Sequence, residues 1–202
     1  MVEAVIFDMG GVVLESKVEE VYTALAKDLS VDSGKLTQIF KDHQGELLSG
    51  KMTAATFAEL AGDVLRIEPG RFVKQWKESY LGVRVVNQEV FGLVKRLKYD
   101  YRVALVSNVS DLHAEINRER GLYTHFNPAI LSCEEGCYKP QAEIFEIALR
   151  KLGTQSGHCV LIDDRKEQLD IPTQMGFRTI WYRSPGQLMR DLECHNVKTQ
   201  NI

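Results

Sequence analysis

Four short apolar segments, separated by helical stretches, place the strongest constraint on the fold of this chain. They are Ala4–Phe7, Val103–Val106, Cys159–Ile162 and Thr179–Tyr182, with Ala129–Leu131 as a weaker fifth. Apolar runs of this length are typical of strands buried on both faces. Between them apolar residues recur at helical spacing, as from Ile144 to Leu152, and a last helix is expected from Leu188. This alternation predicts an α/β fold with a doubly wound, Rossmann-like parallel sheet.

A long stretch after the first strand interrupts the alternation, because it contains no convincing strand. Apolar residues recur there at helical spacing in four segments, Val18–Leu29, Leu36–Phe40, Phe57–Leu65 and Phe72–Tyr80. Asp32 or Ser33 is expected to cap the second of these helices, and Thr53 the third. Trp76 and Tyr80 are interpreted as core residues of the resulting bundle rather than as substrate contacts.

These segments predict a protein of two parts. Residues 1–14 and 86–202 are expected to form the α/β core, and residues 15–85 an inserted helical-bundle cap. The connections near Glu15 and Arg84 are the expected hinges. Closure of such a cap would exclude water from a pocket between the two parts.

The composition of the 202 residues is that of a globular protein, with 44% hydrophobic and 26% charged residues. The formal charge of −3, without a basic run, gives no electrostatic basis for binding nucleic acid or an anionic membrane. No apolar run approaches the roughly 20 residues of a membrane span, and no signal peptide is evident. Cys133, Cys137, Cys159 and Cys194 lack the spacing of a zinc site and are interpreted as ordinary thiols. A cytoplasmic protein is expected, as a monomer or weak dimer.

Polar residues of distinct chemistry follow three of the predicted strands. Asp8 follows the first strand, Ser107 and Asn108 the second, and Asp163 and Asp164 the strand that begins at residue 159. Because the carboxyl ends of parallel strands meet at one edge of a sheet, we expect these groups to converge there. The adjacent carboxylates would repel each other unless a cation or a proton intervenes.

Two glycines and a lysine complete the set. Gly10 and Gly11 leave backbone groups free to approach an anion or a metal. Lys139 stands at the head of the helix predicted near residue 144. Taken singly, these residues also have structural interpretations: the aspartates and Asn108 as turn formers, Ser107 as a helix cap and Lys139 as a solvated charge.

Together the residues form four ordered motifs that resemble those of the haloacid dehalogenase-like hydrolase superfamily, in particular its phosphatases with a small helical cap. The motifs are Asp8-Met9-Gly10-Gly11-Val12, Val106-Ser107-Asn108, Gly136-Cys137-Tyr138-Lys139-Pro140 and Ile162-Asp163-Asp164-Arg165. The resemblance covers essentially the whole predicted core. It implies Mg²⁺-dependent hydrolysis of a small phosphorylated substrate through an aspartyl-phosphate on Asp8.

The resemblance also implies a role for each residue. The implied metal ligands are Asp8, Asp163, Asp164 and the carbonyl of Gly10. The implied phosphate-binding residues are Gly10, Gly11, Ser107, Asn108 and Lys139, and the implied catalytic residues are Asp8, Ser107 and Lys139. A phosphomonoester carries about two negative charges near neutral pH. Mg²⁺ and Lys139 would therefore screen the phosphate from the attacking carboxylate.

Gly10 departs from the pattern of most phosphatases that this chain resembles, which carry an acid–base aspartate at that position. Three hypotheses follow. The substrate could have a leaving group that needs little protonation, as in sugar 1-phosphates or acyl phosphates. A residue of the predicted cap, His43 or Glu46, could supply the proton. Alternatively, the chain binds phosphate without turning it over.

Two other functions stay open as alternatives. A haloacid dehalogenase would fit Gly10, because halide departs without a proton. It would have little use for Asp163 and Asp164, however, and no arginine or aromatic halide cradle lies close to Asp8 in the sequence. A non-catalytic protein that binds phosphate or a partner is disfavoured because binding alone does not require a nucleophile.

Overall fold

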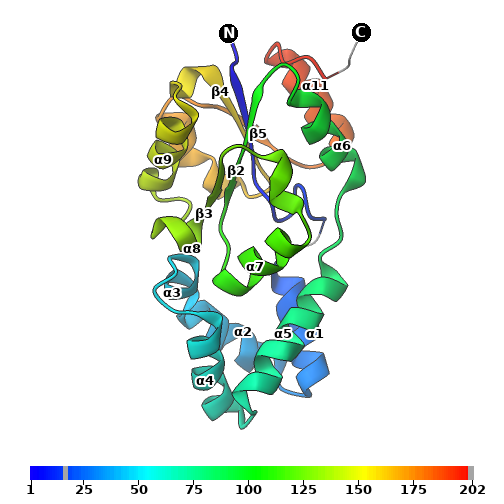
Figure 1. Cartoon of the computed structure of the whole chain (residues 1–202), viewed down its shortest axis with the longest axis vertical. Coiled ribbons are helices and arrows are strands. Elements are labelled where there is room, and N and C mark those ends of the chain that lie inside the picture. Colours follow the sequence, from blue (N-terminus) through cyan, green and yellow to red (C-terminus); the bar gives the residue numbers. More distant parts are fainter. Residues whose placement is uncertain (16–17, 200–202) are drawn as a thin grey trace.

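Five parallel strands form the centre of the α/β core, which makes up one end of the molecule in Figure 1. The computed structural model describes residues 1–15 and 18–199. The strands are β1 (Ala4–Phe7), β2 (Arg102–Ser107), β3 (Ala129–Leu131), β4 (Cys159–Asp163) and β5 (Arg178–Trp181). Their order is β3-β2-β1-β4-β5, with every pair parallel. The predicted parallel sheet is confirmed, although β5 lies one residue earlier than expected.

Helices cover both faces of the sheet, because side chains of a strand alternate between its two faces. Val5 and Phe7 of β1 belong to a cluster that includes α6 (Gln88–Leu97) and α11 (Pro185–Cys194). Ile6 of the same strand belongs to a cluster with α9 (Ala142–Leu152) on the other face. Figure 1 shows α9 on one side of the sheet and α6 and α11 on the other. The doubly wound arrangement is confirmed.

A helical bundle occupies the opposite end of the molecule (Figure 1). It consists of α1 (Val18–Leu29), α2 (Ser33–Asp42), α3 (Gln44–Leu48), α4 (Ala54–Leu65) and α5 (Pro69–Val83). The expected caps are present: Asp32 accepts a hydrogen bond from the N–H of Lys35, and Thr53 accepts one from the N–H of Thr56. Phe40, Phe57, Phe72, Trp76 and Tyr80 are among the bundle's fully buried side chains. Trp76 and Tyr80 are therefore core residues, as expected, although both also line the pocket described below.

Helix α7 (Asp111–Glu119) joins the two ends of the molecule. Although it follows β2 in the core, its Leu112 and Ile116 are buried in the hydrophobic cluster of the bundle. The carboxylate oxygens of Asp111 accept hydrogen bonds of 3.0 and 3.1 Å from the N–H of Ala54 at the start of α4. An anion is favoured at a helix N-terminus. The bundle and the core thus share buried surface as well as a polar contact.

The remaining elements are short. They are α8 (Ser132–Glu135), α10 (Asp170–Gln174) and the 3₁₀ turns η1 (Leu122–His125), η2 (Ser156–His158) and η3 (Lys166–Gln168). Among the residues that the structure describes, no helix combines the length and the apolar character needed to cross a membrane.

Candidate active site

The register of the sheet brings Asp8 and Asp163 side by side at its carboxyl edge. Phe7 is aligned with Ile162 of β4 on one side and with Leu105 of β2 on the other. The N–H of Asp8 donates a 2.9 Å hydrogen bond to the carbonyl of Ile162, so the strand pairing continues to the start of the loop. The carboxyl ends of the three central strands therefore lie together at this edge.

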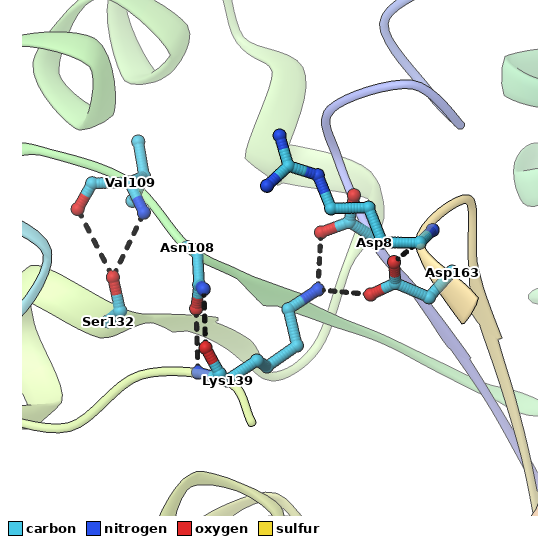
Figure 2. A network of polar contacts seen from close by, with 7 residues as sticks. Asp8, Asn108, Val109, Ser132, Lys139 and Asp163 are labelled. Carbon is cyan, nitrogen blue, oxygen red and sulfur yellow. Dashed lines mark hydrogen bonds and ion pairs between the residues drawn. The ribbon is translucent and has the colours of Figure 1, made fainter. Parts of the chain in front are cut away.

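Lys139 joins two of these carboxylates. Its Nζ donates 2.6 Å hydrogen bonds to Oδ1 of Asp8 and to Oδ2 of Asp163, as Figure 2 shows. The lysine side chain is only 4% exposed, so its interpretation as a solvated charge is wrong. Oxygen atoms of Asp8, Asp163 and Asp164 lie within 4.8 Å of one another. Asp163 is further held by the N–H of Arg165, which donates to its Oδ1 over 2.9 Å.

The charges of this cluster fit a divalent cation. Burial, together with Asp163 and Asp164, raises the pKa of Asp8 to about 7, although Lys139 opposes the shift. Burial disfavours the charge on Lys139, but Asp163 and Asp8 outweigh this and raise its pKa. Three carboxylates around one ammonium leave an excess of negative charge in a buried site. Carboxylate oxygens are the ligands that Mg²⁺ prefers.

Gly11 allows Asp164 to come close to the loop that follows β1. Its φ of +83° is in the left-handed region, and a Cβ at this position would lie 2.3 Å from Oδ2 of Asp164. The N–H of Gly11 donates to the carbonyl of Leu14 over 2.7 Å, and Gly11 does not line the pocket described below. The structure thus uses the Gly11 N–H within the loop, which differs from the expected contact with phosphate.

The loop after β2 is held from two sides. The side-chain amide of Asn108 donates to the carbonyl of Lys139 and accepts from its N–H, over 2.9 and 2.8 Å. The hydroxyl of Ser132 accepts from the N–H of Val109 and donates to its carbonyl (Figure 2). Asn108 therefore positions the lysine loop. Ser110, rather than Ser107, provides the side-chain cap of α7, so the interpretation of Ser107 as a helix cap is wrong.

A pocket with about 900 Å³ of empty space, its open mouth included, lies between the bundle and the sheet edge. The predicted site residues that line it are Asp8, Gly10, Ser107, Asn108, Lys139, Asp163 and Asp164. His43 and Glu46, the proposed proton donors, are not among its lining residues. Instead, Nδ1 of His43 lies 2.9 Å from Oε2 of Glu46. The structure thus gives no support to either as the acid.

The bundle side of the pocket contains groups that sequence reasoning did not assign to it. Trp76, Tyr80 and Arg84 line it from the bundle side, and His113 and Asn117 from α7. The His113 ring stacks on Tyr80 at 4.0 Å, and burial, with Arg84 nearby, lowers its pKa to about 3. The fold thus brings an arginine and aromatic side chains that are distant in the sequence into the pocket that Asp8 lines.

Comparison with known proteins gives a consistent result. A family model described as haloacid dehalogenase-like hydrolase matches residues 2–173. The chain is 25% identical to D-ribitol-5-phosphate phosphatase of Bacteroides thetaiotaomicron over 89% of its own length and 91% of the relative's. It is also 25% identical to rat bifunctional epoxide hydrolase 2 over 73% of its length, but that match spans only 29% of the larger protein.

Solved structures show the same fold. A predicted HAD-like family hydrolase from Porphyromonas gingivalis superposes with a TM-score of 0.82 at 23% identity, covering 99% of this chain and 100% of the other. A HAD family enzyme from Bacteroides thetaiotaomicron, in complex with magnesium and inorganic phosphate, gives 0.77 at 19% identity, with 91% and 95% covered. At these identities the likeness concerns the fold.

Proposed function

The chain belongs to the haloacid dehalogenase-like hydrolase family, and we propose from that premise that it is a Mg²⁺-dependent phosphatase of small phosphorylated metabolites. The observation that carries the proposal is the buried cluster of Asp8, Asp163 and Asp164 around Lys139. A nucleophilic carboxylate, an ammonium and a group of hard oxygen ligands are the parts that phosphoryl transfer needs.

We propose that a carboxylate oxygen of Asp8 attacks phosphorus and that the bond from phosphorus to the leaving oxygen breaks. Lys139 holds the attacking carboxylate and reduces its repulsion from the phosphate. Ser107, which is 3% exposed and lines the pocket, binds a transferring oxygen. Water then hydrolyses the aspartyl-phosphate. Asp8, Asp164 and the Gly10 carbonyl would hold Mg²⁺, which supplies positive charge to the phosphate when bound, with Asp163 beside them.

The comparisons support a phosphatase over other hydrolases. A relative matched over most of both chains is a D-ribitol-5-phosphate phosphatase, and a structural neighbour was crystallised with magnesium and inorganic phosphate. Gly10 supplies no acid to the leaving group, so substrates with good leaving groups, such as sugar 1-phosphates or acyl phosphates, are favoured. We further propose that residues 15–85 act as the cap over the pocket, in a cytoplasmic monomer or weak dimer.

The test is release of phosphate from an aryl phosphate with and without Mg²⁺. We expect Mg²⁺-dependent release by the native protein and a loss of at least about a thousandfold in Asp8→Asn, as for other essential nucleophiles. Asp100→Asn, at an exposed position, is the matched control and should retain full activity. Equal rates for the native protein and Asp8→Asn would show that Asp8 is not the nucleophile.

Haloacid dehalogenation is the second candidate, because Arg84, Trp76 and Tyr80 share the pocket with Asp8. The three clustered carboxylates favour the phosphatase, since a neutral, metal-free reaction does not use them. Chloride release from 2-chloropropionate, measured without added metal, separates the two. Release that exceeds the phosphatase rate would favour dehalogenation.

A further inference from the structure

The guanidinium of Arg84 lies against Gly10 in the pocket that the carboxylate cluster also lines. A Cβ placed on Gly10 would be 2.8 Å from Nη2 of Arg84 and 3.4 Å from its Nη1. Arg84 follows α5, is 8% exposed and contacts the face of Tyr80 at 5.6 Å. Any side chain at position 10 would therefore occupy the space that the guanidinium fills.

Two other cations, Lys139 and Arg165, line the pocket. Lys139 bonds to Asp8 and Asp163, and Arg165 pairs with Glu19 at 2.9 Å. These contacts hold Lys139 at the sheet edge, beside the nucleophile. Arg84, which follows α5, instead reaches the pocket from the bundle side and lies beside Gly10.

Lys139 and Arg84 therefore face different ends of a bound substrate, the phosphoryl group and the leaving group. A phosphoryl group attacked by Asp8 must lie at the sheet edge, next to Lys139 and Ser107. Its leaving group then points away from Asp8, toward the bundle, because attacking and leaving oxygens lie roughly in line. The guanidinium beside Gly10 is on that side. An arginine guanidinium does not serve as a general acid in proteins, but it offers five N–H donors.

On the basis of the proposed phosphatase function, we propose that Arg84 is a catalytic residue that stabilises the departing oxygen. As the phosphorus–oxygen bond breaks, its electron pair stays on the leaving oxygen while phosphorus becomes bonded to Asp8. A guanidinium N–H donates to that oxygen, and the proton it finally takes comes from water. The favoured substrates are those whose leaving group departs as a stabilised anion.

The experiment measures kcat/KM for a series of aryl phosphates of rising leaving-group pKa. For Arg84→Gln we expect a loss of about a hundredfold with the poorest leaving group, as for removal of an oxyanion donor, and only a few-fold with the best. The plot against leaving-group pKa becomes steeper. Lys77→Gln is the control for a loosened bundle, because it removes the ion pair between Lys77 of α5 and Glu119 of α7. The slope of its plot should match that of the native protein.

A second variant displaces Arg84 without removing its charge. Gly10→Ala puts a methyl group into the space of Nη2, so the guanidinium must move and the slope should steepen as in Arg84→Gln. The plot of kcat/KM against leaving-group pKa for the double variant, with Gly10→Ala and Arg84→Gln, should be no steeper than the plot for Arg84→Gln alone. The affinity for inorganic phosphate should change less than about threefold in Arg84→Gln.

The outcomes distinguish this inference from the function on which it rests. A native protein that hydrolyses none of the esters overturns the proposed phosphatase and this role with it. An active native protein whose Arg84→Gln variant loses the same factor with every ester overturns the role of Arg84 alone. A large loss of affinity for inorganic phosphate would assign Arg84 to the phosphoryl group and equally overturn it.

Discussion

Gly11 and Asp164 are in direct contact across the site, since a Cβ on Gly11 would lie 2.3 Å from Oδ2 of Asp164. The contact joins the loop after β1 to the end of β4. It ties the position of a proposed metal ligand to the absence of a side chain at residue 11. Because φ is +83°, a substitution there also strains the backbone.

Gly11→Ala should therefore weaken the metal site without removing a ligand. We expect Mg²⁺ to raise the Tm of the native protein, because an ion that binds only the folded state stabilises it. The rise should be lost in Asp164→Asn and strongly reduced in Gly11→Ala. Thermal unfolding at several Mg²⁺ concentrations measures this. Gly157→Ala, at a position where a Cβ meets nothing within 4 Å, is the matched control. An undiminished Mg²⁺ shift in Gly11→Ala would contradict the prediction.

Asp8→Asn should stabilise the metal-free protein above neutral pH while abolishing activity. The folded-state pKa of Asp8 is raised to about 7 by burial and by Asp163 and Asp164. The folded protein thus binds a proton that the unfolded chain has lost between about pH 4 and pH 7, and stability falls as pH rises through that window. Asparagine carries no such charge. With a chelator present, Tm should fall less steeply in Asp8→Asn than in the native protein as pH rises from 5 to 8. Parallel curves of Tm against pH for the native protein and the variant would show that the charge on Asp8 does not lower stability.

Lys139→Met should destabilise the protein strongly. Removal of one partner from a buried ion pair leaves uncompensated charge, here on Asp8 and Asp163, and costs about 3–5 kcal/mol. Urea unfolding at pH 7 measures the loss. Lys74→Met removes an exposed contact to Glu78 and should change stability by less than about 0.5 kcal/mol. A loss for Lys139→Met no larger than for Lys74→Met would contradict the buried pairing.

His113 should make the fold sensitive to acid. Burial lowers its folded-state pKa to about 3 from the ordinary value of 6.5. Between these pH values only the unfolded chain takes up the proton, so stability is lost as pH falls, by up to about 1.4 kcal/mol per pH unit. His113→Phe, which keeps a ring against Tyr80, should show a shallower loss between pH 6 and pH 4 in urea unfolding. An unchanged slope would show that another group controls it.

The sheet and the carboxylate cluster could be predicted because each follows from local pattern. A short apolar run identifies a buried strand, and a parallel sheet brings the ends of its strands to one edge. Asp163 ends β4, and Asp8 and Asp164 each follow a strand by one residue, so an error of one residue in a strand end does not move them from this edge. Lys139 follows no predicted strand, and its expected place at the same edge rests on its position at the head of the helix near residue 144.

Contacts made by side chains across the molecule could not be predicted in this way. The place of Arg84 over Gly10 depends on the direction in which α5 ends and on a loop far away in the sequence. Ser132 reaches Val109 only through the pairing of β2 with β3. Neither residue carries a pattern that distinguishes it from an ordinary surface arginine or turn serine. The hypothesis of His43 or Glu46 as the acid rests on titratable chemistry and a place in the insertion alone, and neither residue lines the pocket.

The burial of Leu112 and Ile116 among side chains of the bundle means that the hydrophobic boundary differs from the boundary read along the chain. A chimaera that exchanges residues 15–85 for the equivalent segment of a relative would leave two apolar side chains of α7 facing a foreign surface. A chimaera that also exchanges residues 111–119 would keep the contacts between α7 and the bundle. Changes of specificity made by swapping the bundle therefore require two separate segments to be exchanged together.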